Sequence, residues 1–177
     1  MALLSQKKNG IIWLSGIVLL AGISVGMASR LSARGARKVD RIVVEKSKRT
    51  LTLMSGAESL KKYKVALGGQ PIGPKDRQGD HKTPEGVYSV DAKNPNSQFY
   101  KALHISYPNQ LDRANARKLG VSPGGDVEIH GLGSKWGWLG AKHRLTDWTD
   151  GCIALTNDEI DEIYPLIKVG TPVEIRP

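Results

Sequence analysis

Short apolar segments separated by polar turns make up most of the chain from about residue 39 onward. Each segment has apolar side chains at alternating or adjacent positions and is bounded by Gly, Pro or Asn clusters, which is typical of β-strands. The predicted strands are residues 41–45, 50–54, 62–67, 86–92, 102–107, 126–131, 152–155 and 172–177. This number of short strands predicts a mainly β fold of the sandwich or barrel kind.

Two segments carry helical signals instead. Residues 111–119 are followed by Gly120, a residue that commonly ends a helix. Thr156 and Glu159 have the T-x-x-E spacing of a capping box, so a second helix is predicted to begin there and to end or kink at Pro165. Its apolar stripe consists of Ile160, Ile163, Tyr164 and Ile167. The domain is therefore predicted to be mainly β with one or two short helices.

The N-terminal part follows a different pattern. Residues 11–28 are mostly apolar and carry no charge. A signal-peptide core has about 7 to 15 residues and a membrane-spanning helix about 20, so the segment fits either. The triplet 26–28, Gly-Met-Ala, offers a signal-peptidase site, and a buried core helix is the third alternative. We predict a signal peptide or membrane anchor at 1–28, a basic linker at 29–38 and one domain at 39–177.

Charge is distributed unevenly along the chain, which has a formal net charge of +9. Residues 30–49 hold eight basic and two acidic residues, whereas residues 50–177 hold sixteen basic and fifteen acidic ones. The domain is thus nearly neutral and shows no basic stripe that would indicate a nucleic-acid partner. A basic segment beside a membrane favours contact with anionic lipid. Counted alone, the basic residues that follow the apolar segment favour a cytoplasmic location of the domain. The apolar segment itself predicts export, which is the opposite location.

Cys152 is the only cysteine in the 177 residues. A lone cysteine is commonly a small buried hydrophobe, but an unpaired thiol in an exported domain is either inert or reactive by design. A nucleophilic cysteine needs a base to hold it as thiolate and backbone donors for the oxyanion. Gly151 allows close approach of a substrate carbonyl, and the amides near Gly151 and Cys152 are candidate donors.

Four histidines compete for the role of the base. The strand predicted at 126–131 directs its apolar residues to the core, so His130 faces the opposite side at the strand end, beside the flexible Gly131. His143 lies in a Trp-rich segment and is the alternative base. His104 is expected to be a structural residue in a strand, and His81 a surface residue in a polar turn.

Two Gly-rich segments are predicted to form walls around the site. Residues 131–148 contain Trp136, Trp138 and Trp148, and their glycines indicate a mobile lid that binds an extended substrate. The alternative role for these tryptophans is to cover the core. Residues 68–86 are equally rich in Gly and Pro. Neither segment resembles a phosphate-binding loop or a metal-ligand set, so no cofactor and no metal are predicted.

Two motifs carry a family resemblance. "IHG", seventeen residues and "TDGCIAL" resemble the signature HG-x(14–17)-[S/T]-H-G-C of the L,D-transpeptidase (YkuD-type) catalytic domain. "TPEGVYSV" at 83–90 is similar to that family's T-P-x-G-x-[FY]-x-[IV] strand. The resemblance covers about residues 39–177. It implies a β-sandwich-like fold, peptidoglycan stem peptides as substrate, Cys152 as nucleophile, His130 as base and a location outside the cytoplasmic membrane.

The sequence departs from this signature at two positions. Asp150 stands where the family usually has His, and Ala154 where it usually has Arg, so the chain resembles a divergent branch with DGC in place of HGC. Asp150 is expected either to orient His130 or His143, as a triad acid does, or only to cap a turn. Without the Arg, the site lacks a fork for a substrate carboxylate.

These residues predict a two-step acyl transfer through a thioester on Cys152. An amine as the second nucleophile makes the enzyme a transpeptidase. Water makes it a peptidase or amidase that removes cross-links or wall-attached proteins. The third alternative, from another class, is a non-catalytic wall-binding module.

Overall fold

The computed structural model describes residues 38–177. The predicted signal peptide or membrane anchor at 1–28 and residues 29–37 of the predicted basic linker lie outside the described residues. Within the described part, no helix combines the length and the apolar character needed to cross a membrane.

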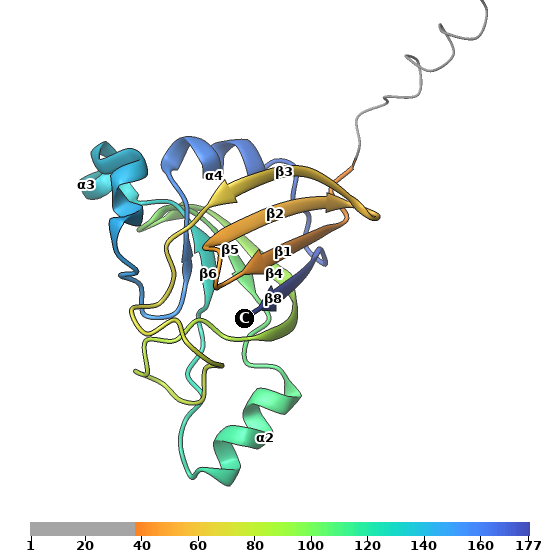
Figure 1. Cartoon of the computed structure of the whole chain (residues 1–177), viewed down its shortest axis with the longest axis vertical. Helices are drawn as coiled ribbons and strands as arrows, with labels where there is room; N and C mark the ends of the chain where they lie inside the picture. Colours follow the sequence, from red (N-terminus) through yellow and green to blue (C-terminus); the bar gives the residue numbers. More distant parts are fainter. Residues whose placement is uncertain (1–37) are drawn as a thin grey trace, which may run out of the picture. The chain divides into compact units, whose positions relative to one another are not determined.

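A mixed sheet forms the centre of the domain (Figure 1). Within residues 38–177 its order is β3-β2-β1-β8-β4-β5-β6-β7, and the described pairs are antiparallel except β1 with β8 and β6 with β7. Each predicted strand is found, so the mainly β prediction is confirmed. The strands are β1 (Arg41–Glu45), β2 (Thr50–Ser55), β3 (Glu58–Lys64), β4 (Gly86–Ser97), β5 (Tyr100–Ile105), β6 (Glu128–His130), β7 (Ile153–Ala154) and β8 (Pro172–Arg176).

The two ends of the sheet approach each other. Residues 65–67, predicted as the end of a strand, continue beyond β3, and Ala66 pairs antiparallel with Ala154 of β7 through two hydrogen bonds of 3.1 and 2.9 Å. Tyr63 of β3 and Ile153 of β7 belong to the same buried core cluster. The sheet therefore curves around a single core, as a barrel-like arrangement requires.

Both predicted helices are present. α2 (Gln110–Lys118) begins with a capping box made by Asn109 and Asp112. α4 (Asn157–Ile163) begins with the predicted Thr156 and Glu159 box and ends before Pro165. In Figure 1, α4 lies at the end of the sheet opposite to α2, and Ile160 and Ile163 are fully buried in the core.

The Trp-rich segment is helical, which the sequence did not predict. It forms α3 (Gly133–Trp136) and the 3-10 helix η1 (Gly137–Leu145). Its glycines lowered the apparent helical propensity, yet two are needed for close packing. A Cβ on Gly133 would lie 2.5 Å from the Gln98 carbonyl oxygen, and one on Gly137 would lie 2.7 Å from Nδ2 of Asn157. The segment is thus a packed wall whose glycines permit close contacts.

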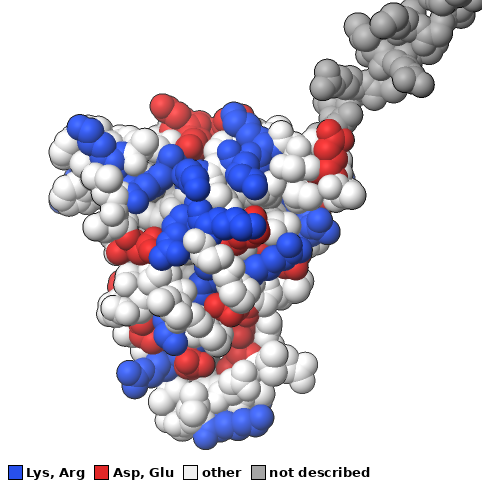
Figure 2. All heavy atoms as spheres, in the orientation of Figure 1, with Lys and Arg blue, Asp and Glu red and all other residues white. Residues whose placement is uncertain are grey.

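Charged side chains of both signs share the face seen in Figure 2. Lys and Arg gather over the upper part of this view, where Figure 1 shows β1 to β3. Three basic residues of β3 and of the turn between β1 and β2 form ion pairs with carboxylates: Lys48 with Glu45, Arg49 with Asp147 and Lys61 with Glu162. The pairs divide the positive charge, so this face is not a continuous basic surface.

Candidate active site

The structure brings Cys152 and His130 to the same side of two adjacent strands. β6 and β7 run parallel with Ile129 opposite Ile153 and His130 opposite Ala154. Side chains alternate along a strand, so His130 and Ala154 face one side while Ile129 and Ile153 face the core. Cys152 immediately precedes Ile153, and its side chain therefore lies on the His130 side. This register places the two predicted catalytic residues on one side of the two strands.

His130 is buried and held in one tautomer. Its Nδ1 lies 2.6 Å from the carbonyl oxygen of Gly131. Because a carbonyl only accepts, Nδ1 carries the proton and Nε2 keeps the lone pair. The ring stacks on Phe99 at 4.3 Å between ring centres and meets the edge of Trp148 at 6.0 Å. Burial lowers the pKa of His130 to about 4. At neutral pH the imidazole is therefore an uncharged base.

Gly131 supports this imidazole and is not a free oxyanion donor. Its amide donates to the carbonyl of Lys101 at 3.2 Å, and its carbonyl accepts from His130. A Cβ on Gly131 would lie 2.7 Å from Oδ1 of Asn157 and 3.0 Å from the Phe99 carbonyl oxygen. Only glycine fits here without displacing a neighbour. The supporting role expected for Gly131 stays a prediction.

The Cys152 thiol is partly exposed and uncharged at neutral pH. Sγ lies 3.6 Å from the carbonyl oxygen of Asp126. Burial raises the pKa of Cys152 to about 11; a hydrogen bond with the backbone of Glu128 opposes this rise, and nearby carboxylates, including Asp150, add to it. A thiolate at rest, expected from the sequence, is disfavoured. Thiol and imidazole are both neutral before reaction.

The Gly151 amide is already engaged. It donates to the hydroxyl of Thr149 at 3.1 Å, and that hydroxyl donates to the Cys152 carbonyl at 2.8 Å. Gly151 has φ 132°, and a Cβ there would lie 2.6 Å from the Lys82 carbonyl oxygen. Of the two amides predicted as oxyanion donors, that of Cys152 is the remaining candidate. Thr149, a motif position without a role in the sequence prediction, holds this turn.

Asp150 pairs with a histidine other than the two predicted. Its Oδ1 lies 2.7 Å from Nδ1 of His81, while Nδ1 of His130 is taken by Gly131. The prediction that Asp150 orients His130 or His143 is therefore wrong. His81, predicted as a surface residue, is half exposed and lies beside the site. The sequence signal available for it was its place two residues before the T-P-x-G motif.

His143 is buried beside Trp148, and its tautomer makes it a poor base. Nε1 of Trp148 donates to Nδ1 of His143 at 3.4 Å, so the proton of the neutral ring lies on Nε2. Within residues 38–177 this Nε2 is buried without a hydrogen-bond partner. Burial, followed by the charge of Arg144, lowers the pKa of His143 to about 4. The geometry favours His130 over the alternative base.

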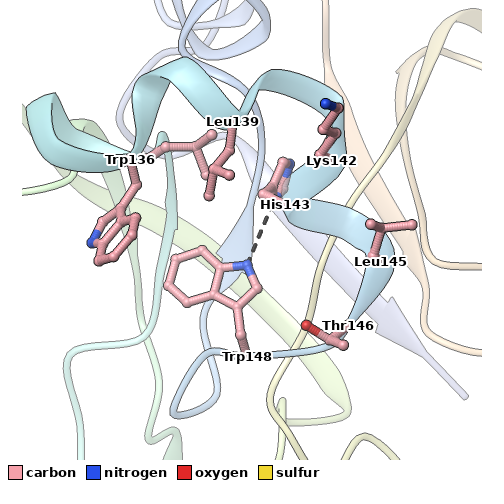
Figure 3. Close-up of a pocket in the computed structure, with 8 residues that line it drawn as sticks. Trp136, Leu139, Lys142, His143, Leu145, Thr146 and Trp148 are labelled. Atoms are coloured by element: carbon pink, nitrogen blue, oxygen red, sulfur yellow. Dashed lines mark hydrogen bonds between the residues drawn. The ribbon is translucent and has the colours of Figure 1, made fainter.

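An apolar pocket of about 450 Å³ lies next to these rings (Figure 3). Trp148 forms one wall and contacts both the His130 and the His143 ring, and Trp136 also lines the pocket. Trp138 is outside this lining and 75% exposed, so only two of the three predicted tryptophans meet here. The remaining lining residues are Leu132, Leu139, Lys142, His143, Leu145 and Thr146.

The described residues 38–177 hold no group of three or more His, Cys, Asp or Glu side chains placed to bind a metal ion. A thiol and a neutral imidazole on one side of adjacent strands are the arrangement used for acyl transfer by a cysteine nucleophile. The chain belongs to the L,D-transpeptidase catalytic domain family (YkuD), whose sequence profile matches residues 39–175.

Known relatives agree with this membership. "Putative L,D-transpeptidase YafK" of Escherichia coli is 36% identical over 133 residues, which are 71% of this chain and 46% of that protein. The chain thus spans about half the length of the curated relative. The helical cell shape determining protein Pgp2 of Campylobacter jejuni matches with TM-score 0.59 and 25% identity, over 84% of this chain and 54% of that one. An L,D-transpeptidase of Mycobacterium smegmatis, 19% identical with TM-score 0.51 over 77% and 58%, shares the fold.

Proposed function

We propose that this protein is a peptidoglycan-modifying cysteine acyltransferase or hydrolase that acts on stem peptides through a thioester on Cys152. One observation carries the proposal: the unprotonated Nε2 of a buried, fixed His130 and the Cys152 thiol lie on the same side of adjacent strands. Family membership supports the choice of peptidoglycan as the substrate. Both members of the nucleophile and base pair are retained, which argues against a non-catalytic wall-binding module.

The first step forms the thioester. Nε2 of His130 takes the thiol proton as Sγ attacks the carbonyl on the L-centre of the diamino acid in the stem. The amide of Cys152 donates to the oxyanion. The C–N bond then breaks, and the leaving amine takes the proton from His130. Because burial favours the neutral forms of both groups, proton transfer accompanies attack and does not precede it.

The apolar pocket gives the stem peptide a binding surface. Trp136 and Trp148 line this pocket, and the Trp148 ring also packs against the His130 ring. Apolar and aromatic walls with few polar groups are typical of small-ligand sites. Trp148 thereby links substrate binding to the position of the base.

The thioester is proposed to be resolved mainly by water. Ala154 is fully buried and paired with Ala66, so no guanidinium stands at this position to hold a substrate carboxylate. Asp150 turns to His81 at the rim of a polar hollow open to solvent. A transpeptidase must orient an amine and exclude water. The absent guanidinium and the open hollow favour attack by water instead. Such an amidase would cleave the bonds of cross-links or the bonds that attach proteins to the wall.

We further propose that the domain acts outside the cytoplasmic membrane, either anchored or secreted through residues 1–28. The similarity to a cell shape determining protein suggests cell shape as the trait affected. We expect activity from a fusion after Pro177 when the reporter is one that works only outside the cytoplasm. Activity of a reporter that works only in the cytoplasm would exclude peptidoglycan as the substrate.

The reaction is tested with the full chain and two substrates. Intact sacculi, and isolated tetrapeptide muropeptides with an added D-amino acid, are incubated with the protein and with Cys152→Ala. We expect masses that correspond to water-derived products, absent from the Cys152→Ala sample. If exchanged or cross-linked products predominate, the protein is a transpeptidase and not a hydrolase.

A further inference from the structure

A polar hollow of about 310 Å³ lies on the Asp150 side of Cys152, away from the residues that line the apolar pocket. Two of its residues adjoin the thiol. Asp126 contributes the carbonyl oxygen that contacts Sγ, and Asp150 precedes Cys152 by two positions. Through Asp126, the hollow therefore shares a neighbour of the reacting sulfur. The hollow also contains His81, which the two-residue mechanism does not use.

The pairing of His81 with Asp150 makes its imidazole a base directed away from Asp150. A carboxylate only accepts hydrogen bonds, so the proton lies on Nδ1 of His81, 2.7 Å from Oδ1 of Asp150. Nε2 keeps the lone pair. An Asp that orients His in this way also stabilises the imidazolium formed when the ring takes a proton. His81 is 54% exposed, so this proton can pass to solvent.

His81 is held in place more firmly than an ordinary surface residue. Its φ of 54° lies in the left-handed region, which is unfavourable for a residue with a side chain. Its carbonyl accepts from the amide of Gln70 at 2.9 Å. The same carbonyl oxygen would lie 2.3 Å from a Cβ on Gly68, so that position has no room for a side chain. The strained backbone is thus fixed by its surroundings.

The residues on either side of His81 are anchored as well. Asp80 is in a buried ion pair with Lys75 at 2.6 Å and accepts from three backbone amides, those of Asp76, Arg77 and Lys82. After it, the Thr83 carbonyl accepts from the buried Nζ of Lys46 at 2.8 Å. A loop tied down at both sides presents the imidazole at a defined place.

We propose that His81 is a second general base, which activates the nucleophile that resolves the Cys152 thioester, and that Asp150 is its positioning residue. This inference rests on the proposed function. It divides the chemistry between two imidazoles. His130, buried against aromatic rings, serves the thiol, and His81, in the polar hollow, serves water or a primary amine. An imidazole borne by a distant loop thus stands beside position 150, where the family motif has its own histidine.

The water oxygen attacks the thioester carbonyl carbon while Nε2 of His81 takes one water proton. The C–S bond breaks, and the electron pair goes to Sγ as thiolate. His81 releases its proton to solvent, Sγ takes up one proton, and the carboxylic acid product ionises. With a primary amine as the nucleophile, His81 takes the amine proton and an amide forms instead.

The test separates formation of the thioester from its decay. The full chain reacts with a tetrapeptide muropeptide, is quenched at intervals, and the mass of the acylated protein is followed. His81→Ala and His81→Gln should acylate at the unsubstituted rate but lose the acyl group about 10²- to 10⁴-fold more slowly, the usual effect of removing a general base. Added imidazole should restore decay in His81→Ala. Asp150→Asn should slow decay with unchanged acylation.

His104→Gln is the matched control, because His104 also pairs with an aspartate, Asp91, through Nδ1. It should leave both rates unchanged. If His81→Gln loses the acyl group at the rate of the unsubstituted chain, the inference is overturned and the proposed function stays intact. If a His81 variant loses acylation and decay equally, melts at a lower temperature and does not respond to imidazole, His81 has a structural role only. That result would also overturn the inference. Absence of any thioester in the unsubstituted chain and in both His81 variants would overturn both proposals.

Discussion

The carbonyl oxygen of Gly131 lies 2.6 Å from Nδ1 of His130, its neighbour in sequence. This contact replaces the carboxylate that orients the imidazole in an Asp-His pair. A carbonyl fixes the tautomer without adding a negative charge, so it stabilises an imidazolium less than an aspartate does. The hydrogen bond to Gly131 offsets only part of the effect of burial, so the pKa of His130 stays low and the imidazole is neutral until it receives the thiol proton.

The nucleophile and base assignments predict distinct losses of activity. Cys152→Ala should abolish turnover of muropeptides, and His130→Ala should lower kcat/KM by about 10²- to 10⁴-fold. His143→Ala should change KM more than kcat, because His143 lines the apolar pocket and its Nε2 carries the proton. Steady-state kinetics on the purified full-length variants checks this. Near-full activity of His130→Ala combined with loss in His143→Ala would reverse the assignment of the base.

The resting state of Cys152 is testable by alkylation. Because burial raises the pKa of the thiol to about 11, iodoacetamide should label Cys152 slowly at neutral pH. The labelling rate should then rise with pH towards that value. Mass spectrometry at a series of pH values gives the profile, with a small free thiol as the reference. Fast labelling that is independent of pH from the acid range upward would instead indicate a thiolate paired with imidazolium.

The sequence predicted the strands and the two helices because those signals are local: alternation of side chains, Gly120 after the first helix, and the Thr156 and Glu159 spacing at the start of the second. It also predicted the pair Cys152 and His130, because a motif fixes their separation along the chain. The partner of Asp150 was not predictable in this way. His81 is 69 residues away, and only the tertiary fold joins the two side chains. The helical Trp-rich segment was missed because glycines needed for close contacts mimic a loop.

Acid should destabilise the fold through His130. Its pKa is about 4 when folded against 6.5 in the ordinary state, so the unfolded chain binds the proton more readily. The contribution of the neutral ring is complete above the ordinary value and is lost as pH falls from 6.5 towards 4. At about 1.4 kcal/mol per pKa unit, the loss is at most about 3.5 kcal/mol.

Urea unfolding at about pH 7 and at about pH 5 checks this prediction, with His130→Gln as the variant that cannot titrate at this position. The variant should lose less stability than the unsubstituted chain between the two pH values, whatever its stability at neutral pH. Equal losses in both would show that His130 is not the source of the acid sensitivity.

Gly151 should be intolerant of substitution. Gly151→Ala places a Cβ 2.6 Å from the Lys82 carbonyl oxygen at φ 132°, so we expect a loss of about 1 to 3 kcal/mol in the free energy of unfolding. Gly125→Ala is the control, because no described atom lies within 4 Å of the added Cβ. Urea unfolding should show a change near zero for the control. Equal stability of the two variants would contradict the packing argument.

The apolar pocket predicts different effects for tryptophans that the sequence alone could not tell apart. Trp136 and Trp148 line the pocket, whereas Trp138, two residues from Trp136, is exposed to solvent outside it. Loss of an aromatic wall removes apolar contact with the substrate, so Trp136→Ala should raise KM with a smaller change in kcat. Trp148→Ala should lower kcat as well, because its ring also packs against His130. Trp138→Ala, with a side chain of equal size removed, should keep both constants near their unsubstituted values. Kinetics with muropeptides measures all three, and a Trp138→Ala effect as large as that of Trp136→Ala would place substrate binding elsewhere.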